Sequence, residues 1–271
     1  MPLKRNGGID AYSGLVRAYE ELFPVHPGTV GYLARAGLAN RARVLDVGCA
    51  SGAHPRAFAA AGYRVVGIDT SEAMIEAARD SAARAPTDCK PESGPSSGPK
   101  GRPEAPRFET AGMLDLERLY PTGTWDAVTC LGNTLPHLRD EAEAEEFLRQ
   151  VRSVLAPGGF LVFQVLNYRR ILAERPERLP RLEAGAWVFE RSYRYGYGFV
   201  EFLTRLMDRS GRTLSEGRTR LLPIFPERIA DLAEGRGFRT AALESGWDGE
   251  PFDPVSSNLV LFRFTSSDQT G

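Results

Sequence analysis

The sequence predicts an α/β protein built on a doubly wound, mostly parallel sheet. Short apolar runs typical of buried strands alternate with amphipathic helical segments, and turns rich in glycine and proline separate them. The chain has 271 residues, of which 42% are hydrophobic. This length and composition suffice for one large α/β domain with an addition.

Charge and cysteine content narrow the class of protein. The formal net charge of −1 does not indicate nucleic acid or an anionic membrane as a partner. The three cysteines, Cys49, Cys89 and Cys130, lack the spacing of a metal site, so we expect no metal and a reduced, cytoplasmic setting. We see neither a signal-peptide core nor a run long enough to span a membrane, and we expect a soluble protein, with homo-oligomer formation left open.

The stretch from Arg43 to Asp69 predicts a strand, a tight turn, a helix and a second strand. An apolar run at 44–47 favours a buried strand, and the small residues at 48–52 allow the backbone to turn. Pro55 suits the beginning of the alanine-rich helix, and a second apolar run ends in Asp69. This βαβ unit places a carboxylate where a cofactor ribose binds.

The turn of this unit does not match a dinucleotide site. Such a site requires three glycines against a pyrophosphate, whereas this turn contains Gly48 and Gly52 and follows an acid, Asp46. Asp46 would repel a pyrophosphate but suits a ligand with an ammonium and a sulfonium. A nicotinamide-dependent oxidoreductase is therefore the disfavoured alternative.

The pattern D-x-G-x-x-x-G at 46–52, followed by G-I-D at 67–69, resembles motif I and the following acid of class I S-adenosylmethionine-dependent methyltransferases. The resemblance implies S-adenosylmethionine as cofactor and a seven-stranded Rossmann-like methyltransferase sheet, with Asp69 accepting from the ribose diol. Ala50 stands where most members have glycine. The cofactor-binding residues that the resemblance implies are Asp46, Gly48, Cys49, Ala50, Gly52, Asp69, Thr70, Met74, Met113, Leu114, Leu131 and Gly132.

The amino-terminal segment predicts a helix from Asp10 to Phe23 and a second one from Thr29 to Leu38. The first helix either packs on the domain or lies over the cofactor pocket, with Tyr12 or Tyr19 at the methyl acceptor. Both interpretations fit its apolar face.

After Asp69 we expect a helix capped by Ser71 and ending near residue 85. Residues 86–106 are dense in Pro, Gly and Ser, which predicts a flexible insertion, with a docking peptide as the alternative. A third strand follows at 107–110. The family's adenine loop comes next, but Gly112 replaces its usual acid, so backbone groups and Met113 are left to hold the adenine.

The fourth strand, at 125–131, leads into C-L-G-N-T-L-P-H-L at 130–138. This segment is similar to C-L-G-N-S-x-x-H-L of glycine and sarcosine N-methyltransferases. The resemblance implies that Asn133 lies beside the acceptor nitrogen. His137 is either a base or a structural residue, and with Tyr12 these two form the candidate catalytic set.

The remainder predicts a helix at 139–155, a fifth strand at 160–166, antiparallel strands at 187–195, 198–207 and 212–222, a helix at 226–237, and a final hairpin at 238–245 and 259–264. The antiparallel strands form a small β cap inserted after the fifth strand. Its basic and aromatic residues fit an RNA face, which we disfavour, a lid or dimer contact, or an arginine that pairs with an acceptor carboxylate.

We therefore expect four regions: a helical segment over the pocket (1–40), the cofactor-binding core (41–168), the cap (169–225), and the final helix and hairpin (226–271). The expected function is an S-adenosylmethionine-dependent methyltransferase (EC 2.1.1.-) that acts on a small-molecule acceptor, favoured to be an amine. Two alternatives stay open: an O-methyltransferase of a small metabolite, and a cofactor-binding protein without methyl-transfer activity.

Overall fold

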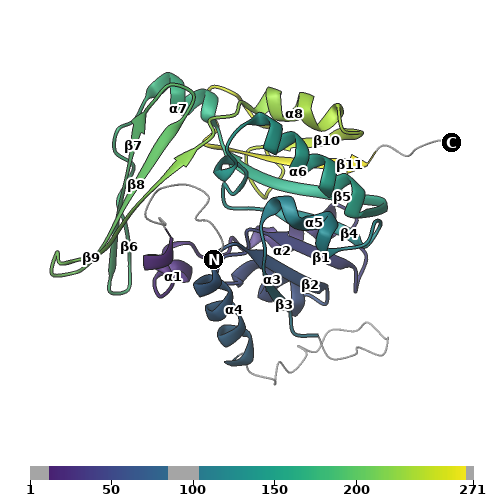
Figure 1. Cartoon of the computed structure of the whole chain (residues 1–271), viewed down its shortest axis with the longest axis horizontal. Coiled ribbons are helices and arrows are strands. Elements are labelled where there is room, and N and C mark those ends of the chain that lie inside the picture. Colours follow the sequence, from purple (N-terminus) through teal and green to yellow (C-terminus); the bar gives the residue numbers. More distant parts are fainter. Residues whose placement is uncertain (1–11, 85–103, 267–271) are drawn as a thin grey trace.

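A seven-stranded sheet runs through the centre of the computed structural model, which describes residues 12–84 and 104–266 (Figure 1). The strand order is β10-β11-β5-β4-β1-β2-β3. Strands β1 to β5 pair in parallel, whereas β11 is antiparallel to β5 and β10. The predicted fold class is confirmed. The strands are β1 (Arg43–Val47), β2 (Arg64–Asp69), β3 (Arg107–Thr110), β4 (Trp125–Cys130), β5 (Leu155–Leu166), β10 (Phe238–Glu244) and β11 (Leu259–Ser266).

Helices cover both faces of this sheet. Apolar side chains of α5, α6 and α8 pack against one face, and those of α2 and α3 pack against the other. Figure 1 shows α6 and α8 on the side of the sheet opposite to α3. The helical elements are η1 (Ser13–Leu15), α1 (Tyr19–Leu22), α2 (Gly28–Arg35), α3 (Ala53–Ala60), α4 (Glu72–Arg84), η2 (Met113–Asp115), α5 (Leu116–Leu119), η3 (Leu135–His137), α6 (Glu141–Val154), α7 (Tyr168–Glu174) and α8 (Pro226–Glu234).

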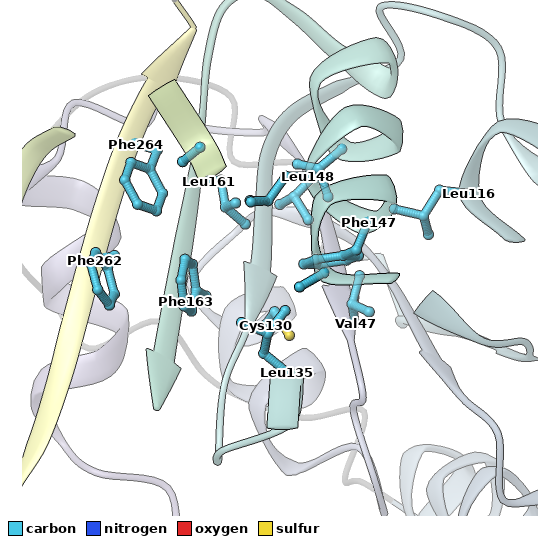
Figure 2. Close-up of a cluster of buried hydrophobic side chains, with 14 of the residues drawn as sticks. Val47, Leu116, Cys130, Leu135, Phe147, Leu148, Leu161, Phe163, Phe262 and Phe264 are labelled. Carbon is cyan, nitrogen blue, oxygen red and sulfur yellow. The ribbon is translucent and has the colours of Figure 1, made fainter. Parts of the chain in front are cut away.

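The larger core fixes the carboxyl ends of the central strands. Phe163 of β5 stacks on Phe262 of β11 with ring centroids 4.7 Å apart, and Phe262 stacks on Phe264 at 5.2 Å (Figure 2). Leu135 of η3 lies beside Cys130 in the same core and is 1% exposed. The loop that follows β4 is therefore anchored by a buried leucine, which limits where the side chains next to it can lie.

A second, four-stranded antiparallel sheet forms a cap between β5 and α8 in the chain. Its order is β6-β7-β8-β9, and it stands to one side of the main sheet in Figure 1. Side chains of η1 and α1 pack against β7 and β8, with α1 drawn between the cap and the main sheet. The cap strands are β6 (Leu182–Ala184), β7 (Trp187–Tyr195), β8 (Val200–Asp208) and β9 (Thr213–Leu221).

Several boundaries differ from the sequence predictions. The expected helix from Asp10 to Phe23 is wrong in the described part: two short elements, η1 and α1, stand in its place. Gly14 lies so close to Ser215 of β9 that a side chain would collide there, and glycine is a weak helix former. The segment thus follows the cap surface rather than one helical axis.

Smaller differences concern single elements. Helix α3 begins two residues before Pro55, which is tolerated because the first-turn N–H groups have no intrahelical acceptor. Helix α7 and strand β6 were not predicted, and β5 begins at Leu155. The predicted insertion at 86–106 lies outside the described residues except for its last three. Within the described residues, no helix combines the length and the apolar character needed to cross a membrane.

Candidate active site

Strand β1 marks the point where the sheet reverses its winding, because its two neighbours are β2 and β4. In open α/β sheets, ligands bind outside the carboxyl ends of the strands at such a point. The loop from β1 to α3 lies there. Its backbone is left-handed at Gly48 (φ 76°), Ala50 (φ 47°) and Gly52 (φ 81°). Alanine adopts this conformation at a cost, so position 50 is held there by its surroundings.

Close packing explains the two glycines of this loop. A Cβ on Gly48 would collide with the side chain of Thr134 in the loop after β4, and a Cβ on Gly52 would lie 2.6 Å from the ring of Phe108. The N–H groups of Gly48 and Cys49 both donate to the carbonyl oxygen of Ile68, at 2.8 and 2.9 Å. The loop is thus fastened to the end of β2.

Asp69 at the end of β2 organises the two loops on either side of it. Its Oδ2 accepts from the N–H of Ala50 at 3.0 Å, and its Oδ1 accepts from the N–H of Ser71 at 2.9 Å. The bond to Ala50 accounts for the left-handed backbone at that residue. Each carboxylate oxygen has a second acceptor position, so these bonds still allow Asp69 to accept from a diol.

Asp46 is the last residue but one of β1 and is 2% exposed. Its Oδ1 accepts from the hydroxyl of Thr129 on β4 at 2.6 Å. Burial raises the pKa of Asp46 to about 7 and the charge of Asp69 adds to this rise, while the bond from Thr129 opposes it. A buried carboxyl with this pKa is poised to ionise when a cation binds beside it.

Helix α1 covers this pair of carboxylates. Burial raises the pKa of the Tyr19 phenol, and the charges of Asp69 and Asp46 raise it further, which places Tyr19 close to both. Glu20 forms an ion pair with Arg56 of α3 at 2.6 Å, and Arg56 also donates to the carbonyl of Ser51. The amino-terminal segment is therefore fastened to α3 and the β1–α3 loop through Arg56.

Burial also keeps Cys49 unreactive. The thiol is 4% exposed, and burial together with the charges of Asp46 and Asp69 raises its pKa. A neutral thiol is a poor nucleophile. Cys49 thus shares the surroundings of the two carboxylates as a packing residue.

The loop after β3 closes the other side of this region. The N–H of Gly112 donates to Oδ2 of Asp115 at 2.9 Å, so Asp115 caps this turn. Thr70 lies next to Gly112. Met113 and Leu114 are half-buried against the main core, while Met74 of α4 is 1% exposed.

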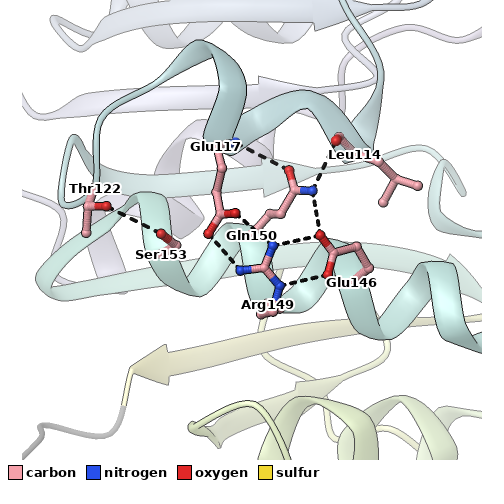
Figure 3. A network of polar contacts seen from close by, with 7 residues as sticks. All are labelled: Leu114, Glu117, Thr122, Glu146, Arg149, Gln150 and Ser153. Atoms are coloured by element: carbon pink, nitrogen blue, oxygen red, sulfur yellow. Dashed lines mark hydrogen bonds and ion pairs between the residues drawn. The ribbon is translucent and has the colours of Figure 1, made fainter.

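A polar network on α6 holds this loop in place. Gln150 donates to the carbonyl of Leu114 at 3.0 Å and accepts from the N–H of Glu117 at 3.3 Å (Figure 3). Arg149 bridges the carboxylates of Glu117 and Glu146 at 2.7 Å each. The backbone of the loop is thus fixed by side chains that lie about 35 residues later in the chain.

Asn133 follows β4 with a left-handed backbone (φ 67°). Its Oδ1 accepts from the N–H of Leu166 at 3.0 Å, and its Nδ2 donates to the hydroxyl of Tyr168 at 3.1 Å. The amide therefore ties the end of β4 to the end of β5 and the start of α7. Leu131 before it is buried, whereas Gly132 is exposed and donates its N–H to Gln164.

Tyr12 and His137, 125 residues apart in the chain, lie in contact. The Tyr12 hydroxyl is 3.3 Å from Nε2 of His137, and the two rings meet edge to face with centroids 5.4 Å apart. Tyr12 also packs against the cap cluster that contains Tyr168 and Tyr193. The loop after β4, the amino-terminal segment and the cap thus converge.

The residues present fit S-adenosylmethionine. Two neighbouring carboxylates suit the ammonium, the sulfonium and a ribose diol, and the positive-φ glycines allow close approach of a ligand to the backbone. The half-buried Met113 and Leu114 offer an apolar edge at the neighbouring loop. Fold and site together define an α/β protein that binds this cofactor.

Comparison with known proteins supports this conclusion. Residues 44–159 match the family model described as "Methyltransferase domain". Over 250 residues the chain is 31% identical to the ubiquinone biosynthesis O-methyltransferase of Bordetella bronchiseptica, covering 92% of this chain and 82% of that protein. It is 31% identical to rat glycine N-methyltransferase over 141 residues, which are 48% of this chain and only 42% of that protein. The solved structure of the CcbJ methyltransferase from Streptomyces caelestis has a TM-score of 0.75 at 22% identity, covering 96% and 99% of the two chains.

The chain belongs to the class I S-adenosylmethionine-dependent methyltransferases, and S-adenosylmethionine is its cofactor.

Several residues of the site were not among the predicted ones. Thr129 looks like an ordinary strand residue, and only its pairing with β1 shows that it faces Asp46. Tyr168 and the cap residues are joined to the loop after β4 by long-range packing, for which the sequence gives no local signal. Tyr19, by contrast, was expected at the acceptor as an alternative to Tyr12, and in the structure the charges of Asp69 and Asp46 act on its phenol.

Proposed function

We propose that this protein transfers a methyl group from S-adenosylmethionine to the nitrogen of a small amine. The observation that carries the proposal is the state of the tyrosines near the loop after β4. Burial raises the pKa of Tyr193 to about 12, and burial also raises that of Tyr168. These raised pKa values disfavour both phenols as bases near neutral pH.

An amine acceptor does not need such a base. It loses its proton to water before it binds, and its nitrogen lone pair is then free to attack, whereas a hydroxyl must be deprotonated during the reaction. The name of the relative glycine N-methyltransferase supports an amine as well. When bound, the cofactor supplies a methyl group carried by a sulfonium, and the sulfur is left as a neutral thioether once the methyl group is transferred.

The residues of this chain then contribute binding and orientation. Asp69 and Asp46 hold the cofactor's hydroxyl and cationic groups, and α1 with Tyr19 excludes water from them. Asn133 acts as a positioning residue, because its two hydrogen bonds fix the loop at the end of β4 against β5 and α7. Holding two reactants in one geometry is a large part of catalysis for an in-line displacement.

The second candidate function is O-methylation with His137 as base. The contact between Tyr12 and Nε2 of His137 favours it, since the phenol would orient the imidazole. The name of the relative ubiquinone biosynthesis O-methyltransferase also supports it. A His137→Ala variant should then lose the rise in rate near neutral pH. A structural His137 instead predicts lower thermal stability and an unchanged pH profile.

The test is the formation of S-adenosylhomocysteine, followed by mass spectrometry, across a panel of small amines and matched phenols. We expect turnover with at least one amine and a methyl group on its nitrogen. Turnover restricted to phenols would replace the proposal with O-methylation. Cofactor binding by calorimetry without any turnover would favour a cofactor-binding protein that lacks methyl-transfer activity.

A further inference from the structure

In the cap sheet, residues that lie side by side across neighbouring strands form rows on each face. One such row is polar, although the rows on both sides of it are largely apolar. Residues that pair directly across an antiparallel sheet point to the same face, and alternate residues of a strand share that face. On β7 the alternate residues Phe189, Arg191 and Tyr193 therefore share one face. The row through Arg191 is Arg191, Thr204 and Gly217, and the rows beside it are Phe189, Leu206 and Ser215, and Tyr193, Phe202 and Thr219.

This face is the one turned toward the amino-terminal segment. Phe189 packs with Leu15, Ala18 and Leu22, and Tyr193 packs in the cluster that Tyr12 borders. Thr204, opposite Arg191, is 7% exposed. The half-buried Arg191 and the buried Thr204 thus lie between two apolar clusters, where polar groups are costly to bury unless they are hydrogen-bonded.

The hydrogen bonds of Arg191 are incomplete. Nη2 donates to the carbonyl of Pro180 at 2.8 Å, which uses one of the five N–H donors of a guanidinium. Its Nε–H is buried and has no hydrogen-bond partner among the described residues. Burial lowers the pKa of Arg191, while Tyr193 and Tyr12 oppose this. Tyr193 shares a face of β7 with Arg191, and Tyr12 borders the cluster that contains Tyr193.

Two chains of contact connect Arg191 with the end of β4. Tyr12, which borders the cluster of Tyr193, touches His137 of η3. Tyr193, on the same face of β7 as Arg191, shares a cluster with Tyr168, whose hydroxyl accepts from Asn133. Arg191 therefore borders the same region as the loop that faces the methyl group in the proposed reaction.

We propose that Arg191 binds a carboxylate of the methyl acceptor, which makes the acceptor an amino acid rather than a simple amine. This inference rests on the proposed function and specifies its substrate class. A planar guanidinium pairs with a carboxylate through two parallel N–H···O bonds, and the buried Nε–H is one donor of such a pair. The hydroxyl of Thr204 lies across the sheet to help position the same group.

The experiment compares each α- and β-amino acid of a panel with its own carboxamide as acceptor. For the wild type we expect kcat/KM to favour the acid over the amide by at least about tenfold, the order expected for one lost charged contact. Arg191→Met should remove this preference by slowing the acid at least about tenfold and the amide less than about threefold. Arg191→Lys should retain part of it.

Arg194→Met is the matched control. Arg194 is on the same strand but points to the opposite face and is exposed. It should keep the preference of the wild type. The dissociation constant for S-adenosylmethionine, measured by calorimetry, should stay within about threefold in every variant, which separates lost acceptor binding from lost folding.

Equal rates for acids and amides in the wild type would overturn the inference while leaving N-methylation intact. Equal losses for both in Arg191→Met would show a structural role and also overturn it. Should no amine turn over, calorimetry of the amino-acid panel on the complex with S-adenosylhomocysteine decides the matter. If an amino acid binds to the wild type but not to Arg191→Met, the carboxylate site is supported although the proposed function fails. If no amino acid binds to the wild type, both the inference and the proposed function are overturned.

Discussion

The cofactor half and the acceptor half of the site are built in different ways. The carboxylates and the left-handed loop that fit the cofactor come from residues 46–71, within one βαβ unit. The acceptor half that we propose would draw on Tyr12, Asn133, Tyr168 and Arg191, which belong to four separate segments. A local motif thus forms the first half, and tertiary packing assembles the second.

The two halves also depend on different neighbours for their geometry. The β1–α3 loop is tied to β2 by hydrogen bonds from Gly48 and Cys49 to Ile68, so its geometry depends on near neighbours. The acceptor half depends on where the cap and the amino-terminal segment sit. We expect substitutions in the first half to change cofactor affinity and substitutions in the second to change the rate.

The largest expected effect is in the cofactor half. Asp69→Ala removes the carboxylate that would accept from the ribose diol, so S-adenosylmethionine should bind more weakly by about 2 to 3 kcal/mol, or roughly 30- to 150-fold. Because Ala50 and Ser71 also lose their acceptors, a lower melting temperature should accompany the change. Calorimetric titration measures the affinity, and an unchanged dissociation constant would contradict the assignment of Asp69.

The second-largest effect is expected on turnover, from a substitution in the acceptor half. Asn133→Ala leaves the N–H of Leu166 and the hydroxyl of Tyr168 without their partner, so the loop after β4 loses its fixed position. We expect turnover to fall at least about tenfold, equivalent to roughly 1.4 kcal/mol, with cofactor affinity within severalfold of the wild type.

Asn133→Gly is the matched control for the left-handed backbone at this position. It loses the same amide but tolerates φ 67° without strain. The two variants should therefore be equally slow, with the glycine variant the more stable one. Full activity in both would refute the positioning role of Asn133.

A smaller effect is expected in the pH dependence of cofactor affinity, which tests the role of Asp46 alone. Its pKa in the folded protein is about 7, above the ordinary value of 3.8, so folding favours its neutral form. This contribution to the stability of the ligand-free protein is complete below about pH 4 and is lost as the pH rises through 7. A cationic ligand prefers the ionised form, so affinity for S-adenosylmethionine should rise with pH up to about 7 and then level off.

Calorimetry at several pH values between about 5.5 and 7.5 measures this slope, which is at most about tenfold per pH unit for one proton. Asp46→Asn should flatten it and bind weakly at every pH. A slope that persists in Asp46→Asn would assign the titration to another group.

The smallest effect is expected outside both halves. Removal of residues 86–106, with a short glycine linker in their place, should leave the melting temperature and cofactor affinity nearly unchanged, because loop closure depends weakly on length. Differential scanning calorimetry checks this. A clear loss of either quantity would mean that the segment docks on the protein.

The contrast between a local motif and tertiary packing also explains which parts of the fold and the site could be predicted from the sequence. The pattern from Asp46 to Asp69 is local, so the cofactor followed from it, while apolar runs alternating with helical segments along the chain predicted the fold class and most strand positions. Asn133 and His137 were recognised by their motif, but not the direction of the Asn133 amide, since its partners Leu166 and Tyr168 depend on the parallel pairing of β4 with β5. Arg191 could not be singled out among many arginines, because its orientation depends on the register of β7 with β8.

Within residues 12–84 and 104–266, the hydrogen bonds of Asp69 to Ala50 and Ser71 and those of Asn133 to Leu166 and Tyr168 involve different residues. The account's central claim is that the halves contribute separately to methyl transfer. A double-mutant cycle of Asp69→Ala and Asn133→Ala, measured in kcat/KM for S-adenosylmethionine, tests it most directly. We predict that the two losses add to within about 0.5 kcal/mol. A double variant no slower than the slower single variant would contradict the separation.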